Sequence, residues 1–208
     1  MRTLNVTMLF HHEKLRDFVV GIFIDRVMNH KIPPLLALTV ADTHSLSTLQ
    51  GAAYYTQLLD LEQVTSTRET SSHAMRFGDH NGFTQDQFAH LLHGHWALVH
   101  LWDDLRNNPV AASCTCNRRG CSDIWYNAWL HRCKRTWSNT HSADVLGKLR
   151  KIRTYLRSDG ITDSMSEPCQ KASLSALAEK IIDLQDSLID YFDFTRPTTG
   201  VMDEEQTE

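Results

Sequence analysis

Apolar side chains recur every three or four residues along most of the chain, which is the spacing of an amphipathic helix. The clearest case is residues 84–108, where Thr84 and Gln87 fit a capping box and Pro109 ends the pattern. The broad apolar face of this segment consists of Phe88, Leu91, Leu92, His95, Trp96, Val99, Trp102 and Leu105. We predict one helix across the whole segment.

The same spacing predicts helices in six further segments. Pro33 and Pro34 end the first of them and open the second, and Ser45 is the expected N-cap of the third. In that third segment Gly51, followed by two alanines, would let a neighbouring helix approach closely. No alternating run of apolar and polar residues predicts a strand, so we expect an all-α fold of about six to seven helices. The predicted helices cover residues 15–30, 33–44, 45–61, 84–108, 122–137, 142–158 and 166–192.

Polar segments set the limits of the domain. Residues 62–83 are rich in Ser and Thr without a sustained period, and this composition predicts a long surface loop. A second loop is expected over 108–121. The acidic residues 194–208 predict a disordered tail. We therefore expect a single helical domain over residues 10–193.

Composition and charge exclude several classes of protein. The 208 residues are 41% apolar, and 21 Lys and Arg against 25 Asp and Glu leave a net charge of −4. There is no overall basic field to attract nucleic acid or an anionic membrane. No apolar run could span a bilayer, no signal peptide precedes the first helix, and the odd number of five cysteines argues against a secreted disulfide framework. We expect an intracellular protein, cytoplasmic or nuclear, whose cysteines are reduced.

The stretch CTCNRRGCSDIWYNAWLHRC contains four of the five cysteines. Cys114, Cys116 and Cys121 are candidate zinc ligands, but a closed zinc site needs four ligands. A helix over 122–137 carries Cys133 about 18 Å from Cys121 at 1.5 Å per residue, so these two cannot share one metal. We therefore expect no metal and no cofactor, and the three-thiolate site is the alternative.

The helix over 122–137 presents cysteine and tryptophan side chains at intervals of four residues, which is typical of a buried face. Ser122 is its expected N-cap. This helix and the one over 84–108 contribute all five tryptophans, and we predict that the core is built around both of them. The expected core residues are Trp96, Trp102, Trp125, Trp129 and Cys133.

Four histidines lie on the helix over 84–108. At 100° per residue, His90, His93 and His100 fall on its polar side and His95 on its apolar side, so the four do not converge on a metal. We expect the first three to be solvated and His95 to be a core residue with one hydrogen bond. An enzyme would need a histidine such as His95 beside a buried carboxylate, a pairing that the sequence does not reveal. No phosphate-binding loop, nucleophile elbow or zinc-protease helix is present, and no catalytic residue is predicted.

Seven short motifs follow one another in a fixed order between Leu15 and Phe192. They are RDFVV (16–20), IPPL (32–35), the helix over 46–58, LLHG (91–94), paired cysteines ahead of Trp-x3-Trp (116–129), DVLGKL (144–149) and MSEPC (165–169). Their order resembles the helical region that follows the BTB/POZ domain in proteins of basidiomycete fungi. The resemblance implies a role in protein–protein interaction. The BTB/POZ unit of such proteins dimerises or recruits a partner, and we expect this chain to lack that unit.

We expect a non-catalytic helical scaffold that contacts another protein, with neither a membrane nor nucleic acid as partner. The alternative is a zinc-stabilised nuclear or nucleic-acid-binding module that uses the basic segment KLRKIRTYLR (148–157). Its expected zinc ligands are Cys114, Cys116 and Cys121, with His131 or His141 as the fourth. Metal content separates the two hypotheses.

Overall fold

The computed structural model describes residues 13–66, 83–110, 116, 120–136, 141–158, 162 and 164–194. Within these residues the regular secondary structure is entirely helical, which confirms the predicted all-α class. The predicted loop over 62–83 is wrong at its start, because residues 62–66 continue the preceding helix. Residues 67–82 of that loop and 195–208 of the predicted tail lie outside the described part. The helices are α2 (Glu13–Met28), α3 (Pro34–His44), α4 (Ser47–Ser66), α5 (Gln85–Asn107), α6 (Cys121–Thr136), α7 (Val145–Ser158), α8 (Glu167–Asp186) and α9 (Leu188–Phe192).

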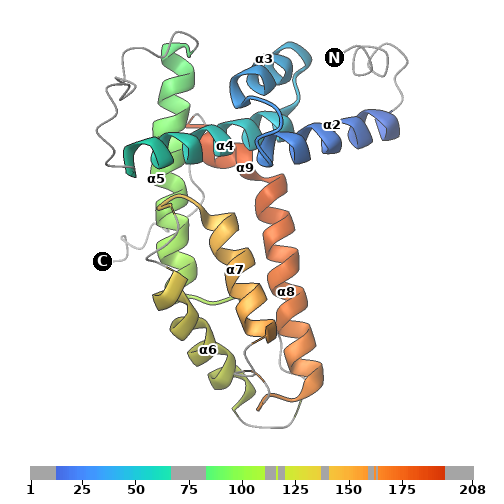
Figure 1. The fold of residues 1–208 in the computed structure, drawn as a ribbon. Coiled ribbons are helices and arrows are strands. Elements are labelled where there is room, and N and C mark those ends of the chain that lie inside the picture. The colour runs from blue at the N-terminus through green and yellow to red at the C-terminus, as the bar shows by residue number, and fades with distance from the viewer. Residues whose placement is uncertain are drawn as a thin grey trace, which may run out of the picture.

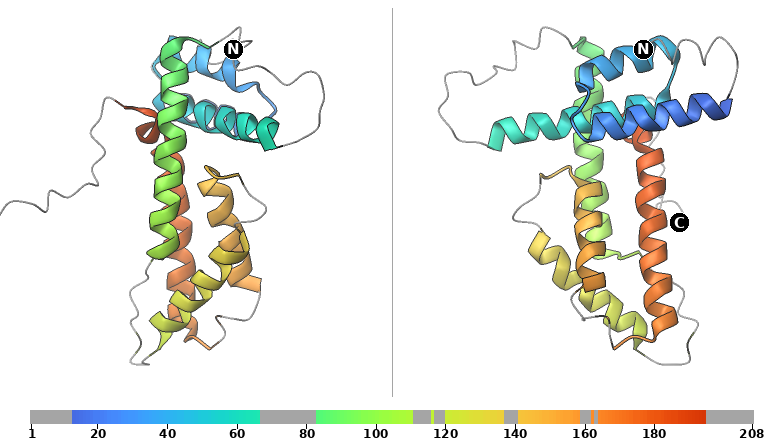
Figure 2. Two further views of the ribbon diagram at one scale, coloured as in Figure 1. Left: turned by 90° about the vertical axis from the view of Figure 1, so that its left-hand side faces the viewer. Right: turned by 45° about the vertical axis from the view of Figure 1, so that its right-hand side comes forward.

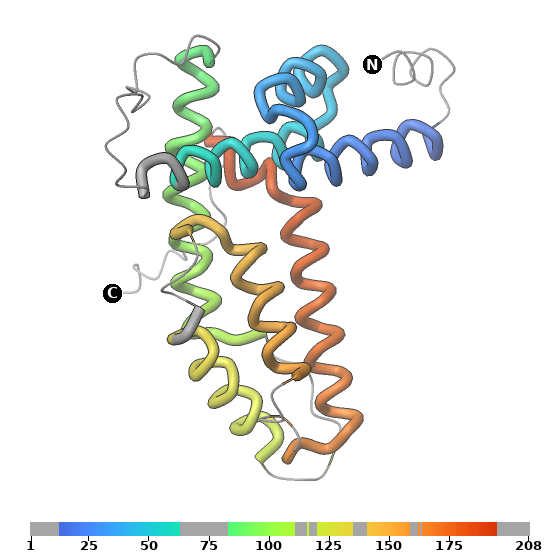
Figure 3. The backbone as a smooth tube through the Cα atoms, in the orientation of Figure 1, coloured from blue at the N-terminus to red at the C-terminus, as the bar shows by residue number. Residues whose placement is uncertain are grey.

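The long helix α5 contacts helices at both ends of the molecule (Figure 1). At one end α2 and α3 pack against α4, and at the other end α7 packs against α6 and α8. Both views in Figure 2 show α4 crossing α5. The chain passes from α8 directly into α9, which packs against α4 and α5 (Figure 3). None of the described helices combines the length and the apolar composition needed to cross a bilayer.

The start of α5 confirms the predicted capping box. Thr84 Oγ1 accepts a hydrogen bond from Gln87 N at 3.2 Å, and Gln87 Oε1 accepts one from Thr84 N at 3.1 Å. The predicted cap of α4 is wrong. Ser45 has a φ of 51° and lies in the left-handed region at the C-terminal end of α3, two residues before α4 begins. Ser45 therefore ends one helix and does not begin the next.

The predicted cap of α6 is also wrong, because the helix begins at Cys121 and Ser122 already lies inside its first turn. Gly120 precedes the helix with a φ of 115°, a conformation that glycine adopts without a steric penalty. Its carbonyl oxygen accepts a hydrogen bond from Ile124 N at 2.9 Å. The glycine, and not the serine, therefore sets the start of α6.

Tryptophan side chains fix α6 against the end of α5. Four of the five residues predicted for the core are buried: Trp102, Trp125, Trp129 and Cys133. Trp125 Nε1 donates to Val110 O, and Trp129 Nε1 donates to Leu105 O, each at 2.9 Å. Each bond gives a buried indole N–H the partner that it needs. The two hydrogen bonds therefore hold both α6 indoles in one orientation at this end of the molecule.

The fifth predicted core residue, Trp96, is 55% exposed, so this part of the prediction is wrong. The buried face of α5 consists of Leu91, Gly94, Ala97, Leu98, Trp102 and Leu105. At 100° per residue Trp96 lies about 200° from both Gly94 and Leu98, on the opposite side of the helix. Apolar residues surround most of α5, and for that reason the pattern did not reveal which side faces the core.

Hydrogen bonds of Tyr55 and Asp144 join α4 to α7. The Tyr55 hydroxyl donates to Asp144 Oδ1 at 2.7 Å and accepts a hydrogen bond from Leu146 N at 3.2 Å. Asp144 Oδ1 also accepts from Gly147 N at 2.8 Å, and the carboxylate thereby caps the first turn of α7. A Cβ atom on Gly147 would lie 2.1 Å from Asp144 Oδ2. The glycine therefore leaves room for this cap.

We expect the folded protein to lose stability above pH 10, in part through Tyr55. Burial, and then the neighbouring Asp144 carboxylate, raise the pKa of Tyr55 well above its ordinary value of 10.0. Above pH 10 the unfolded chain releases this proton while the folded chain retains it, so the free energy of unfolding falls as pH rises. The fall in the free energy of unfolding between about pH 9 and about pH 11 should therefore be smaller in Tyr55→Phe than in the wild type.

Urea unfolding at several pH values checks this expectation. At pH 7 Tyr55→Phe should lower the free energy of unfolding by about 1–3 kcal/mol, because Asp144 and the Leu146 N–H lose a partner. The exposed Tyr126, which lies on α6, supplies the matched control Tyr126→Phe, whose pH profile should follow that of the wild type. Equal losses in the wild type and in Tyr55→Phe would contradict the expectation.

Candidate functional site

Three cysteines from two parts of the chain meet where α6 and α8 begin. Cys116 precedes α6, Cys121 is its first residue, and Cys169 lies in the first turn of α8. Their Sγ atoms lie within 4.8 Å of one another, and those of Cys116 and Cys121 are 3.5 Å apart. Cys116 is half-buried and the other two side chains are buried. The cluster thus gathers three potential thiolate ligands at one point.

This cluster differs from the set that the sequence suggested. Cys114 lies outside the described residues, and Cys169 was not among the candidates. Cys133 lies further along α6 and is not a member of the cluster, in agreement with the helix geometry. Burial raises the pKa of Cys133 to about 12, so this side chain is an uncharged part of the core. One feature of the sequence could have added Cys169 to the candidates. It lies near the start of a predicted helix, and Cys121 directly precedes the start of another.

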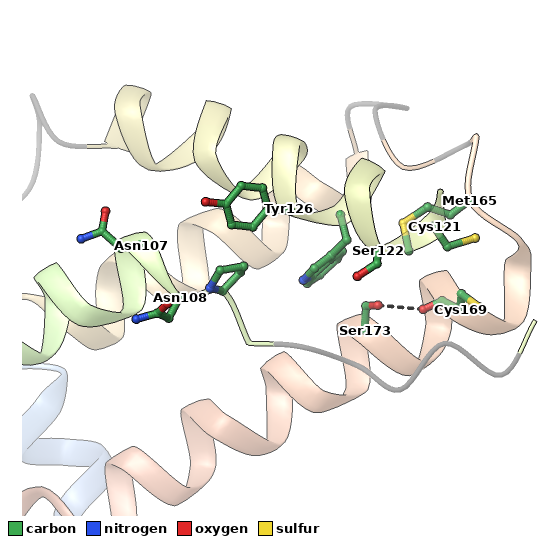
Figure 4. A pocket seen from close by; sticks show the side chains of 10 residues that line it. Asn107, Asn108, Cys121, Ser122, Tyr126, Met165, Cys169 and Ser173 are labelled. Carbon is green, nitrogen blue, oxygen red and sulfur yellow. Dashed lines mark hydrogen bonds between the residues drawn. The ribbon is translucent and has the colours of Figure 1, made fainter. Parts of the chain in front are cut away.

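A cavity of about 360 Å³ lies beside the cysteine cluster (Figure 4). Cys121 and Cys169 line one end of it, and Asn107 and Asn108 line the other. Ser173 Oγ donates to the carbonyl oxygen of Cys169 at 2.9 Å, a bond that is drawn in the figure. The volume falls at the small end of the range for ligand pockets. The cavity provides space next to two of the three sulfur atoms.

A second polar cluster forms where α4, α5 and the turn before α7 meet. His95 Nε2 lies 3.0 Å from Glu62 Oε1 and 3.1 Å from Ser142 Oγ, and Ser142 Oγ donates to Glu62 Oε1. His141 Nδ1 lies 3.8 Å from Glu62 Oε2. The prediction of a core His95 with one hydrogen bond is wrong, because its side chain is 43% exposed and has two polar neighbours.

The second cluster does not have the geometry of a catalytic triad. In a triad the serine and the carboxylate bind opposite nitrogen atoms of the histidine ring. Here Glu62 and Ser142 both meet Nε2 of His95. Glu62 also accepts a hydrogen bond from Ala143 N at 3.3 Å. The arrangement links the end of α4 to the turn before α7.

Two of the three histidines expected to be solvated are partly buried. His90 Nδ1 lies 2.5 Å from the carbonyl oxygen of Phe192, and Nε2 of His93 is buried with no hydrogen-bond partner among the described residues. His100 is exposed as expected, and its ring lies edge-on to Trp96 with the ring centres 4.3 Å apart. The metal-ligand cluster found in the described part of the chain contains cysteines and no histidine.

The basic segment 148–157 does not form a continuous charged surface. Lys148 is 3% exposed, its Nζ donates to Ser142 O at 2.5 Å, and it lies 4.8 Å from the ring centre of Trp102. Burial lowers the pKa of Lys148, and nearby carboxylates oppose that shift. Arg150 donates to Gln185 Oε1 on α8 at 2.7 Å. Arg150 is nevertheless exposed, as are the other three basic side chains of the segment: Lys151, Arg153 and Arg157.

Exposed apolar side chains gather around Trp96 on α5. Leu92 is 57% exposed, Trp96 55% and Phe194 50%. His93 connects them, since its ring centre lies 6.2 Å from that of Trp96 and 6.4 Å from that of Phe194. His100 flanks the indole on the next turn. We call Leu92, His93, Trp96, His100 and Phe194 the Trp96 surface.

Comparisons with known proteins find no relative of this chain. No family model matches it, and no curated protein or solved structure matches it. The resemblance to the region after a BTB/POZ domain stays a prediction.

Proposed function

We propose that the chain is a non-catalytic helical scaffold that binds another protein through the Trp96 surface. The observation that carries the proposal is the exposure of Trp96, which is 55% accessible in the middle of the longest described helix. Tryptophan is a frequent anchor in protein interfaces, since it buries a large apolar area and loses little conformational freedom. Because the Trp96 indole is exposed to water, it contributes nothing to the core.

Trp96 is part of a contiguous exposed apolar surface, which favours a binding interface over an isolated exposed residue. Leu92 precedes Trp96 by one helical turn, and His93 and Phe194 extend the apolar area through ring contacts. Single exposed apolar residues are ordinary, whereas a contiguous group with a polar edge is typical of a binding surface. We expect the partner to present an apolar side chain that packs on the indole.

A non-catalytic role is supported by the geometry around His95. Glu62 and Ser142 meet the same ring nitrogen, so the histidine cannot pass a proton between them as it does in a triad. The carboxylate instead accepts hydrogen bonds that hold the turn before α7. We assign these residues a structural role.

The nucleic-acid alternative has less support. Lys148 is buried against Trp102, and Arg150 is bonded to Gln185, so two of the five basic residues in the segment are engaged within the protein. A phosphate-binding surface needs several cations that point into solvent. The scaffold role also agrees with the role that the resemblance to post-BTB regions implies, and we propose an intracellular location for it.

The test begins with a photo-crosslinking amino acid at position 100 of the full chain, beside the Trp96 indole, in extracts of the native source. A protein captured there is then purified, and its affinity is measured by calorimetry for the wild type and for variants. Trp96→Ala should weaken binding by about 30-fold or more, which corresponds to the 2 kcal/mol of an interface hot spot. Its circular dichroism should be unchanged, because the side chain does not contribute to the core.

The matched control is Phe18→Ala, since Phe18 is a 66% exposed aromatic residue on α2. This variant should bind as tightly as the wild type. An unchanged affinity in Trp96→Ala would contradict the proposal. A loss confined to Phe18→Ala would assign the interface to α2 and contradict it as well.

A further inference from the structure

The start of α6 and the start of α8 bring together three sulfur atoms from two distant parts of the chain. Cys116 precedes α6 and Cys121 is the first residue of that helix, while Cys169 follows 48 residues after Cys121, by the difference of their numbers. Among the described residues these three form the group of potential metal ligands whose ligand atoms all lie within 4.8 Å. Two distant parts of the chain thus converge on one point.

We propose that Cys116, Cys121 and Cys169 bind one zinc ion. Zinc–sulfur bonds of about 2.3 Å in a tetrahedral site place neighbouring sulfur atoms about 3.8 Å apart. The Cys116 and Cys121 sulfur atoms are 3.5 Å apart, and the whole group fits within 4.8 Å. A zinc ion could therefore enter with only small movements of the side chains. This proposal reverses the expectation of a metal-free protein.

Ordinary core packing explains the three cysteines less well. A cysteine that only fills space in the core is a small buried side chain, and Cys133 on the same helix is the example, at 1% exposure and outside the cluster. In contrast, Cys121 and Cys169 each stand in the first turn of a helix, where backbone N–H groups favour negative charge. That position suits thiolates, which are the form that binds zinc.

The three cysteines leave one coordination position for a ligand outside the trio. A water molecule can hold that position, as it does in open zinc sites, and the proposal rests on the three described cysteines. The cavity beside Cys121 and Cys169 offers an ion a route to the sulfur atoms.

A zinc ion at this position would tie the segment before α6 to α8 and restrict the intervening chain. Because the three ligands meet only in the folded protein, the binding free energy would add to the stability of the fold. Removal of the metal with a chelator should therefore lower the thermal midpoint. It should also expose the half-buried Cys116 thiol to alkylation.

The experiment uses the full chain, purified in the presence of reductant. Elemental analysis should find about one zinc ion per chain, and titration of the stripped protein against a chromophoric chelator should give the affinity. Cys169→Ser should weaken zinc binding by more than about 100-fold, the upper end of the effect of altering an outer-shell partner. Cys133→Ala removes a cysteine from the same helix as Cys121, and it should bind zinc like the wild type.

A second measurement does not depend on variants that could fail to fold. Cobalt substituted into the wild-type protein should give the intense sulfur-to-cobalt charge-transfer absorption and the visible bands of a tetrahedral thiolate site. A wild-type protein with no stoichiometric zinc and no such spectrum would overturn the proposal. Equal zinc affinity in a folded Cys169→Ser variant and the wild type would overturn it too, because Cys169 would then not be a ligand.

Discussion

Replacement of Trp129 by alanine is expected to lower the free energy of unfolding by about 3–5 kcal/mol. The indole is fully buried, at 0% exposure, and its Nε1 donates to Leu105 O at 2.9 Å. The variant would leave a cavity between α5 and α6 and a carbonyl group without its donor. Small proteins have about 5–15 kcal/mol in total, so this loss would remove a large fraction of the stability. Urea unfolding followed by circular dichroism measures it.

The matched control for Trp129→Ala is Trp96→Ala. Both variants remove an indole, but Trp96 is 55% exposed and should change the free energy of unfolding by less than about 1 kcal/mol. Because both variants lose an indole ring, the difference between their free energies of unfolding measures the effect of burial. Similar losses in both variants would mean that Trp96 lies in the core, which would also remove the basis of the proposed binding surface.

The order of the helices could be predicted from local signals, but their ends could be predicted only approximately, since α4 continues five residues past the predicted end at residue 61. Spacings of three and four, the capping box at Thr84 and the proline pair before α3 each act within a few residues. The predicted helix over 166–192 is interrupted at Ser187, where the chain turns from α8 into α9. The apolar spacing continues across that turn because Leu188 and Phe192 are also buried, against other helices. A periodic pattern reports burial and does not report a change of direction.

The candidate site could be predicted only in part, because its members come from distant segments. Cys116 and Cys121 are near neighbours in sequence, and both were named as ligand candidates. Cys169 joins them only through the packing of α7 between α6 and α8, which no local pattern describes. The pairing of His95 with Glu62 likewise depends on how α4 crosses α5. Sequence spacing therefore identified ligand types, and the fold selected which of them meet.

Replacement of Gly51 by alanine is expected to destabilise the protein by about 3 kcal/mol, the upper part of the usual range for overpacking. Gly51 lies in α4 where α9 crosses it, as the Gly-Ala-Ala sequence predicted for a close helix contact. A Cβ atom there would lie 2.5 Å from Ile189 N and 3.1 Å from Leu188 C. These are backbone atoms, so no side-chain rotation can relieve the clash and α9 would have to move away from α4.

The control for Gly51→Ala is Gly21→Ala, because Gly21 lies on the exposed side of α2 and a Cβ atom there meets nothing within 4 Å. Alanine is the better helix former by about 1 kcal/mol, and Gly21→Ala should therefore be slightly stabilising. The same helix preference acts at Gly51, so the two variants differ only in the contact with α9. If both glycine variants were stabilising in thermal unfolding, α9 would not pack on α4 in this way. Opposite signs would establish that close backbone packing, and not helix preference, makes glycine necessary at position 51.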